Sequence, residues 1–264
     1  MDYPDSVRFL YSLGNEVKTA KLGLERVLQL AGALGDPHRH GRILHVAGTN
    51  GKGSVAAMLE SSLRAAGYST GLYTSPHLAE PTERIRINGA PVPASDFAAA
   101  FNEVHAVAEA ELESGALDLH PTYFESVTLM AFLLFRRLRV DFTVLEVGLG
   151  GRLDATNIVQ PAVTVVTPVD FDHEAWLGTS LEAIAGEKAG ILKPGVPVIL
   201  GRQRPQAEAV LLARAAELGA PVRRIVDCRT TPGPATPWAS ELDVAEPVPL
   251  HLRVPLPGAH QLDN

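Results

Sequence analysis

Residues 45–54, HVAGTNGKGS, contain the residue types of a phosphate-binding loop. Glycines allow positive φ and let backbone N–H groups come close to a ligand. Lys52 supplies a full positive charge for phosphate oxygens, and Ser54 supplies a hydroxyl for Mg²⁺. In the standard loop, four residues separate two glycines, and Lys and Ser/Thr follow the second directly. Here the first two glycines are closer, and Gly53 lies between Lys52 and Ser54, so a variant phosphate loop and a glycine-rich turn are both compatible with the spacing.

The neighbouring residues favour phosphate binding. Arg42–Ala47 (RILHVA) is a short apolar run that predicts a strand, and 54–66 has the apolar spacing of a helix that ends at Gly67. A helix that begins near Ser54 presents unsatisfied N–H groups and the positive end of its dipole to an anion. We therefore interpret the loop as a phosphate site.

Polar residues also follow three other predicted strands, 70–74, 142–147 and 163–168. In open α/β sheets, ligands bind beyond the carboxyl ends of the strands, so these residues are expected to form one site with the glycine loop. The residues in question are Ser75, Pro76 and His77 after the first strand, Glu146 and GLGGRLDATN at the end of the second, and Asp170, Asp172 and His173 after the third.

Glu146 and His173 are candidate metal ligands. Glu146 ends an apolar strand, where a carboxylate is costly to desolvate unless it meets a cation. Such an acid holds the metal in phosphoryl-transfer enzymes, although amides of the following glycine loop could cap it instead. His173 follows two aspartates and is either a metal ligand or a histidine bonded to a carbonyl. The GLGG at 148–151 lacks the third spaced glycine of a dinucleotide-binding fingerprint, which disfavours that reading.

The order of the predicted helices and strands indicates an α/β fold. This fold is a P-loop-containing, doubly wound and mostly parallel sheet flanked by helices. Predicted helices alternate with apolar strands along most of the chain. The helices are expected at 24–35, 54–66, 122–139, 179–191 and 205–218, and a further strand of this pattern at 196–200. Residues 227–257 are rich in Pro and Thr and contain one predicted strand, Leu250–Val254, so we expect a small β-rich appendage or a linker there.

Composition indicates a globular chain without a nucleic-acid or membrane partner. The 264 residues are 46% hydrophobic and 20% charged, with a net charge of −7 that provides no basic field for nucleic acid or anionic lipid. The longest apolar run, Leu129–Phe135, is too short to span a bilayer. Cys228 is the single cysteine, and the N-terminus does not resemble a signal peptide, so a cytoplasmic location is expected. We also expect a monomer.

Taken together, the motifs resemble the folylpolyglutamate synthase/dihydrofolate synthase family of the Mur ligase superfamily. The matching segments are HVAGTNGKGS (45–54), GLYTSPHL (71–78), ERIRING (83–89), TYFE (122–125), LEVGLGGRLDATN (145–157), DHEAWLG (172–178) and EKAGILKPG (187–195). The resemblance implies a Mur-ligase central domain and an ATP-dependent ligase that joins L-glutamate to a dihydropteroate or folate carboxylate. The carboxylate would attack the γ-phosphate of ATP to form an acyl phosphate, which the glutamate amine then displaces.

The same resemblance assigns roles to individual residues. It implies that Thr49, Asn50, Gly51, Lys52, Gly53 and Ser54 hold the ATP phosphates, with Lys52 on the β- and γ-oxygens. Ser54, Ser75 and Glu146 would bind one Mg²⁺ and His173 a second. Lys188 matches a lysine that is carbamylated in this family, whereas the sequence alone favours an ordinary exposed helix lysine. Lys52, Glu146, His173 and Lys188 form the expected catalytic set.

The substrate side is assigned in the same way. The segment 75–89, with Ser75, Pro76, His77 and Arg84, resembles the mobile substrate loop. The residues that resemble the pterin side are Thr122, Tyr123, Phe124, Glu125, Arg152, Leu153, Asp154 and Ala155, with Thr19 to Lys21 as weak candidates. The TYFE segment is similar to the bifunctional type, which implies that both dihydropteroate and tetrahydrofolate are accepted.

The resemblance also predicts a boundary near the end of the chain. Residues 1–257 would form the ATP-binding domain, and 258–264 the start of a C-terminal glutamate-ligase domain, with Asn264 near the adenine. We therefore expect the 264-residue chain to bind Mg-ATP weakly and not to complete ligation by itself.

Three other functions were considered. A peptidoglycan-precursor Mur ligase normally carries a UDP-binding domain before the glycine loop, and the residues that precede the loop here are too few for one. A nucleotide-binding regulatory module without catalysis is an alternative from a different class. A small-molecule kinase is disfavoured because the loop lacks the adjacent Gly-Lys-Ser/Thr.

Overall fold

The computed structural model describes residues 1–14 and 23–264, and the chain forms two compact units. The first unit comprises Met1–Leu44 and Ala56–Pro161, and the second comprises His45–Val55 and Ala162–Asn264. Strand β1 (Arg42–Ala47) contributes its first half to one unit and its second half to the other.

The helices and strands predicted from the sequence are present with small shifts at their ends. The described α-helices are α1 (Tyr3–Ser12), α2 (Glu25–Ala33), α3 (Lys52–Ala65), α4 (Ala94–Glu113), α5 (Tyr123–Arg137), α6 (Glu174–Leu177), α7 (Leu181–Ala189) and α8 (Pro205–Glu217). The described strands are β1 (Arg42–Ala47), β2 (Thr70–Tyr73), β3 (Ile85–Ile87), β4 (Ala90–Pro91), β5 (Phe142–Glu146), β6 (Val163–Val166), β7 (Val198–Leu200), β8 (Val222–Arg224), β9 (Thr230–Thr236), β10 (Ala239–Val244) and β11 (Leu250–Val254). Among the helices of the described residues, none has the length and apolar character needed to cross a membrane.

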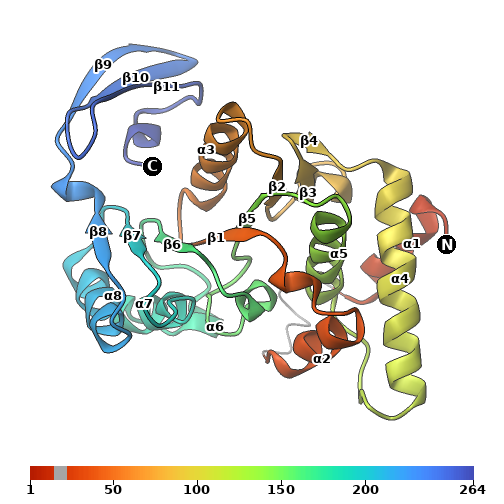
Figure 1. Ribbon diagram of the computed structural model, residues 1–264. Coiled ribbons are helices and arrows are strands. Elements are labelled where there is room, and N and C mark those ends of the chain that lie inside the picture. The colour runs from red at the N-terminus through yellow and green to blue at the C-terminus, as the bar shows by residue number, and fades with distance from the viewer. Residues whose placement is uncertain (15–22) are drawn as a thin grey trace. The chain divides into compact units, whose positions relative to one another are not determined.

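In the first unit, the sheet has the strand order β4-β3-β2-β5-β1 (Figure 1). Strands β2 and β5 are parallel and pair Tyr73 with Leu145, while β3 and β4 continue the sheet in antiparallel fashion. The pairing of Tyr73 with Leu145 brings the residues that follow β2 next to the end of β5.

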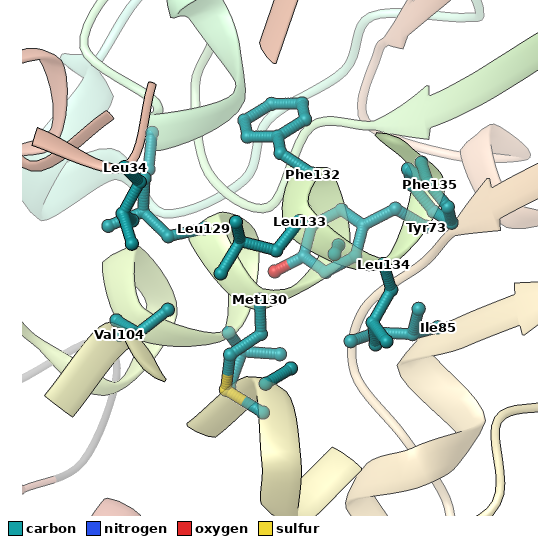
Figure 2. Close-up of a cluster of buried hydrophobic side chains, with 14 of the residues drawn as sticks. Leu34, Tyr73, Ile85, Val104, Leu129, Met130, Phe132, Leu133, Leu134 and Phe135 are labelled. Carbon is teal, nitrogen blue, oxygen red and sulfur yellow. The ribbon is translucent and has the colours of Figure 1, made fainter. Parts of the chain in front are cut away.

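Helix α5 forms the centre of the hydrophobic core of the first unit. Its residues from Val127 to Phe135 are all buried, which explains the apolar run in the sequence. The helix packs against α1, α2, α4 and β2. In Figure 2, Leu129 and Met130 lie towards Leu34 and Val104, and Leu134 lies beside Ile85. Burial of this helix on several sides fixes the position of its N-terminal residues, which belong to the expected substrate side.

In the second unit, the strand order is β1-β6-β7-β8, and β6, β7 and β8 run parallel. The N–H of Thr167 donates to the carbonyl oxygen of Ala47 at 2.8 Å, which joins the end of β1 to the end of β6. Helices α7 and α8 pack on each other. The predicted α/β fold with a mostly parallel sheet is confirmed.

The predicted β-rich appendage is an antiparallel sheet with the order β11-β10-β9 (blue in Figure 1). The predicted strand Leu250–Val254 is β11, whereas β9 and β10 were not predicted. Strand β9, TTPGPAT, contains two prolines and a glycine, a composition that argues against a strand. It forms because it lies at the edge of the sheet, where proline does not interrupt the hydrogen bonding.

Candidate functional site

The glycine loop of the second unit runs between β1 and α3 and requires glycine at two positions. Gly48 has φ +148°, and a Cβ atom there would lie 1.8 Å from Oγ1 of Thr167. Gly51 has φ +80°, a left-handed conformation that a residue with a side chain rarely adopts. The loop therefore passes close to the end of β6 in a conformation that other residues would strain.

Hydrogen bonds fix the loop to the segment that follows β6. The N–H groups of Thr49 and Asn50 both donate to the carbonyl oxygen of Pro168, at 2.9 and 3.3 Å. The hydroxyl of Thr49 donates to the carbonyl of Asp170 and accepts from its N–H, at 2.9 and 3.1 Å. The backbone N–H groups of Thr49 and Asn50 and the hydroxyl of Thr49 therefore hold the loop in position. The N–H groups of the first turn of α3 precede its first internal hydrogen bond and suit an anion.

Two lysines flank this loop. Lys52, the first residue of α3, donates from Nζ to the carbonyl oxygen of Thr49 at 3.1 Å. Lys188 of α7 is only 2% exposed, and its Nζ donates to the carbonyl oxygen of Gly48 at 2.8 Å. Lys188 is therefore not the exposed helix lysine that the sequence alone favoured. It joins α7 to the first residue of the loop.

The segment that follows β6 carries the candidate residues Asp170, Asp172 and His173. Asp170 forms an ion pair with Arg204 at 2.9 Å. A backbone hydrogen bond from Phe171, together with Arg204, lowers the pKa of the Asp170 carboxyl. His173 has φ +45° and precedes α6. Its Nε2 lies 3.5 Å from Oδ1 of Asp172, and its side chain is 40% exposed, so it is accessible to a ligand.

The structure places Asn264 against the glycine loop. A Cβ atom on Gly51 would lie 2.2 Å from Oδ1 of Asn264, and the Asn264 amide donates to Oε1 of Gln261 at 2.9 Å. Asn264 also lines a pocket within the second unit. The other residues of its wall include Val55, Val165, Pro168, Ile199 and Ile225. An apolar pocket with an amide at its edge has the chemistry to hold a nucleobase.

In the first unit, Ser75 and Glu146 lie together, as predicted from their positions at strand ends. The N–H of Ser75 donates to Oε2 of Glu146 at 3.0 Å, and Glu146 is 4% exposed. Two amides of the glycine loop that follows bind another carboxylate. The N–H groups of Gly148 and Leu149 donate instead to Oδ2 of Asp154, at 2.9 and 3.0 Å.

Asp154 organises the loop between β5 and the turn at Ala155–Ile158. Its Oδ1 accepts hydrogen bonds from the N–H and the hydroxyl of Thr156. Burial raises the pKa of Asp154, and these hydrogen bonds oppose that shift. The neighbouring candidates differ in exposure, because Arg152 is exposed, Leu153 is half-buried and Ala155 is buried. Asp154 therefore positions the loop from which Arg152 projects.

The TYFE segment begins α5. Thr122 is the N-cap residue and forms a capping box with Glu125. The Glu125 carboxylate also receives Arg26, whose Nε lies 3.1 and 3.0 Å from its two oxygens. The ring of Phe124 lies 2.5 Å from the position of a Cβ atom on Gly148, so that glycine makes room for it. Arg26 was not predicted, because an arginine within an amphipathic helix pattern gives no signal of its partner.

His77, Arg84 and Tyr123 form an aromatic and basic cluster with Tyr11, which was also not predicted. Nε of Arg84 donates to Nδ1 of His77 at 2.8 Å, so a neutral His77 carries its proton on Nε2 and donates to the Tyr11 hydroxyl, 3.0 Å away. The Arg84 guanidinium lies 5.1 Å from the centre of the Tyr123 ring, and Tyr11 stacks on Tyr123. Ring faces and a cation suit a flat aromatic ligand.

The expected substrate loop is held together by Glu83. Its carboxylate accepts from the N–H groups of Leu78, Ala79 and Glu80 at 2.8 to 3.0 Å. These hydrogen bonds lower the pKa of Glu83 to about 2. Pro76 is exposed at the start of this loop. The weak candidates Thr19 to Lys21 lie outside the described residues.

Comparisons with known proteins find similar chains. A family model described as the Mur ligase middle domain matches residues 46–214. A dihydrofolate synthase/folylpolyglutamate synthase of Bacillus subtilis is 40% identical over 250 residues, which are 92% of this chain and 57% of that protein. The Escherichia coli protein of the same name is 47% identical over 207 residues, 78% of this chain and 47% of the relative. The chain thus spans about half the length of these relatives.

A solved structure described as an FPGS-AMPPCP-folate complex has the same fold. The two chains superpose with a TM-score of 0.90 at 37% sequence identity, and the match covers 99% of this chain and 64% of the solved chain. The fold of this chain is therefore shared with that protein.

Proposed function

The chain belongs to the Mur ligase middle domain family, and from this premise we propose that it is the nucleotide-binding part of an ATP-dependent ligase. The proposed reaction joins L-glutamate to the carboxylate of dihydropteroate or a folate. The observation that carries the proposal is the glycine loop of the second unit, which lies between Lys52, Lys188 and Asn264. Two similar proteins are named dihydrofolate synthase/folylpolyglutamate synthase, which supports the choice of substrate.

The loop residues would act mainly by binding and orienting ATP. Lys52 and the N-terminal turn of α3 place positive charge and N–H donors where the β- and γ-phosphates would lie. A carboxylate oxygen of dihydropteroate or the folate forms a bond to the γ-phosphorus while the bond to the ADP oxygen breaks. The glutamate amine then attacks the acyl carbon, phosphate leaves, and the amine gives up a proton to form the amide.

Residues around Glu146 fit a magnesium ion. Mg²⁺ prefers oxygen ligands, and the Glu146 carboxylate beside Ser75 provides them. We expect the Ser54 hydroxyl to complete this ligand set, and the imidazole of His173 to contribute to a second site. The ions would supply positive charge to the phosphate oxygens.

Carbamylation of Lys188 is a further part of the proposal that can be tested separately. The buried amine donates to Gly48 in its ordinary form, and a carbamate would convert this cation to an anion. Incubation with ¹³C-labelled bicarbonate would give a carbamate carbonyl resonance that disappears in Lys188→Arg. A spectrum without that resonance shows that Lys188 acts as an ammonium group.

The proposed activity is tested in the protein that carries this chain, by following ADP formation from ATP with dihydropteroate and glutamate. We expect ADP formation to require both substrates and to yield dihydrofolate. ATP turnover that is independent of both would support the regulatory nucleotide-binding module instead.

A cytoplasmic location and a monomeric state stay predictions, to be checked by cell fractionation and light scattering.

A further inference from the structure

Three metal-competent side chains, none of which has been assigned a role above, meet in the first unit. They are His105 and Glu109 of α4 and His120 in the segment that connects α4 to α5. One ligand atom from each lies within 4.8 Å of the others. This is the one such group of three found among the described residues.

The distances suit a tetrahedral metal ion. Oε1 of Glu109 lies 3.6 Å from Nδ1 of His105 and 3.3 Å from Nε2 of His120. Metal–ligand bonds of about 2.0 to 2.2 Å at the tetrahedral angle place neighbouring ligand atoms about 3.3 to 3.6 Å apart. The carboxylate oxygen is therefore already about one tetrahedral edge from each nitrogen.

The hydrogen bonding of His120 supports the same conclusion. Its Nδ1 lies 3.1 Å from the carbonyl oxygen of Pro121, and a carbonyl can only accept, so Nδ1 carries the proton. In the neutral ring, Nε2 is then unprotonated and lies 3.3 Å from Oε1 of the Glu109 carboxylate. Two acceptor atoms this close repel each other, and a cation bound by both removes the repulsion. A carbonyl that accepts from the other ring nitrogen and so fixes the ring is usual for metal-binding histidine.

The surroundings favour a defined site over three mobile surface groups. Nδ1 of His105 and Nε2 of His120 are buried and make no hydrogen bond within the described part of the chain. The Phe9 ring contacts both imidazoles, and Phe101 stacks on His105. The two histidine side chains are 19% and 21% exposed, whereas Glu109 is 47% exposed. The metal-facing atoms are thus held in place, with an entry path on the Glu109 side.

We propose that His105, Glu109 and His120 bind a divalent transition metal ion of the zinc type, with water in the fourth position. Two imidazoles and one carboxylate select such an ion over Mg²⁺, which prefers oxygen ligands alone. The ion would join the segment before Thr122, the N-cap residue of α5, to helix α4. Its role would be to stabilise the start of α5, which belongs to the expected substrate side.

The test is a titration of the metal-free 264-residue chain with Zn²⁺ by calorimetry, in excess Mg²⁺ so that oxygen-ligand sites are occupied. We expect one equivalent of Zn²⁺ to bind, and Co²⁺ in its place to give the visible absorption of a tetrahedral complex. Glu109→Gln and His120→Gln should each weaken binding at least about tenfold. Glu113→Gln on the same helix and Glu146→Gln should leave it unchanged.

Two results would overturn the proposal. One is the absence of Zn²⁺ binding in excess Mg²⁺. The other is equal affinity in the wild-type chain and Glu109→Gln, or a loss of binding in Glu146→Gln alone. Circular dichroism verifies that each variant is folded. If His120→Gln does not fold, Glu109→Gln decides, because that side chain is the most exposed of the three.

Discussion

The ammonium group of Lys188 lies 2.8 Å from the carbonyl oxygen of Gly48, so a helix residue far along the chain fixes the first residue of the glycine loop. Substitution Lys188→Met keeps the aliphatic stem and removes the donor, which leaves a carbonyl without this partner. We expect unfolding free energy to fall by about 1 to 3 kcal/mol. We also expect weaker nucleotide binding, measured by urea unfolding and by titration with ATP. Unchanged stability and affinity would show that the contact does not hold the loop.

Gly48→Ala tests whether the loop depends on its close approach to β6. The added Cβ would lie 1.8 Å from Thr167, and the backbone has φ +148°, so both sterics and strain oppose the change. Destabilisation of about 1 to 3 kcal/mol is expected. Gly32→Ala is the matched control. This glycine lies inside α2 with no atom near its Cβ position, so the change should stabilise by about 0.5 to 1 kcal/mol. Equal effects in the two variants would contradict this account.

The Arg26–Glu125 pair should contribute much more to the free energy of unfolding than a surface ion pair does. The Arg26 and Glu125 side chains are only 14% and 6% exposed, and Arg26→Met leaves the carboxylate in a buried position. We expect a loss of about 3 kcal/mol, near the lower end for breaking a buried pair. Arg214→Met breaks the pair with Glu217, whose side chains are 46% and 64% exposed, and should change stability by less than about 1 kcal/mol. Thermal unfolding of both variants measures the two losses of stability. Similar Tm shifts would contradict the expected difference between the buried and the exposed pair.

Buried His45 should make the chain less stable in acid. Burial, with a smaller contribution from Lys193, lowers the pKa of His45 from 6.5 to about 3. Between these pH values the unfolded chain binds the proton and the folded chain does not, so stability falls as pH decreases from 6.5 towards 3. The slope from this group is at most about 1.4 kcal/mol per pH unit. His45→Gln should flatten the pH profile of urea unfolding over that window, and a profile as steep as that of the wild type would be the contrary result.

Regular elements could be predicted where the apolar pattern was strong. The strand Arg42–Ala47 was predicted with its observed ends, and α5 and β5 differ from expectation by one or two residues. Helix α4 was not predicted at all, although it has 20 residues. It contains many alanines, so its buried face has little apolar contrast with its exposed face. Strands β3 and β4 were missed because two or three residues carry no periodicity.

Candidate site residues could be predicted where chain order alone positions them. Ser75 follows β2 and Glu146 ends β5, and the two residues meet because these strands are parallel neighbours whose carboxyl ends share one edge of the sheet. Tyr11 and Arg26 could not be predicted, since tertiary packing brings them to His77 and Glu125. The assignment of Asp154 to the substrate side stays a prediction, and the structure adds that its carboxylate organises the loop.

The most direct test of the central claim is calorimetric titration of the 264-residue chain with Mg-ATP, compared with Lys52→Met. Lys52 begins α3 and carries the loop's own positive charge, so its removal should weaken binding at least about tenfold, the loss of one charge-assisted contact. Arg214→Met should bind as the wild type does. Saturable Mg-ATP binding that Lys52→Met reduces in this way is the predicted result. Absence of binding in the wild type, or equal affinity in Lys52→Met, would contradict the assignment of this loop to ATP.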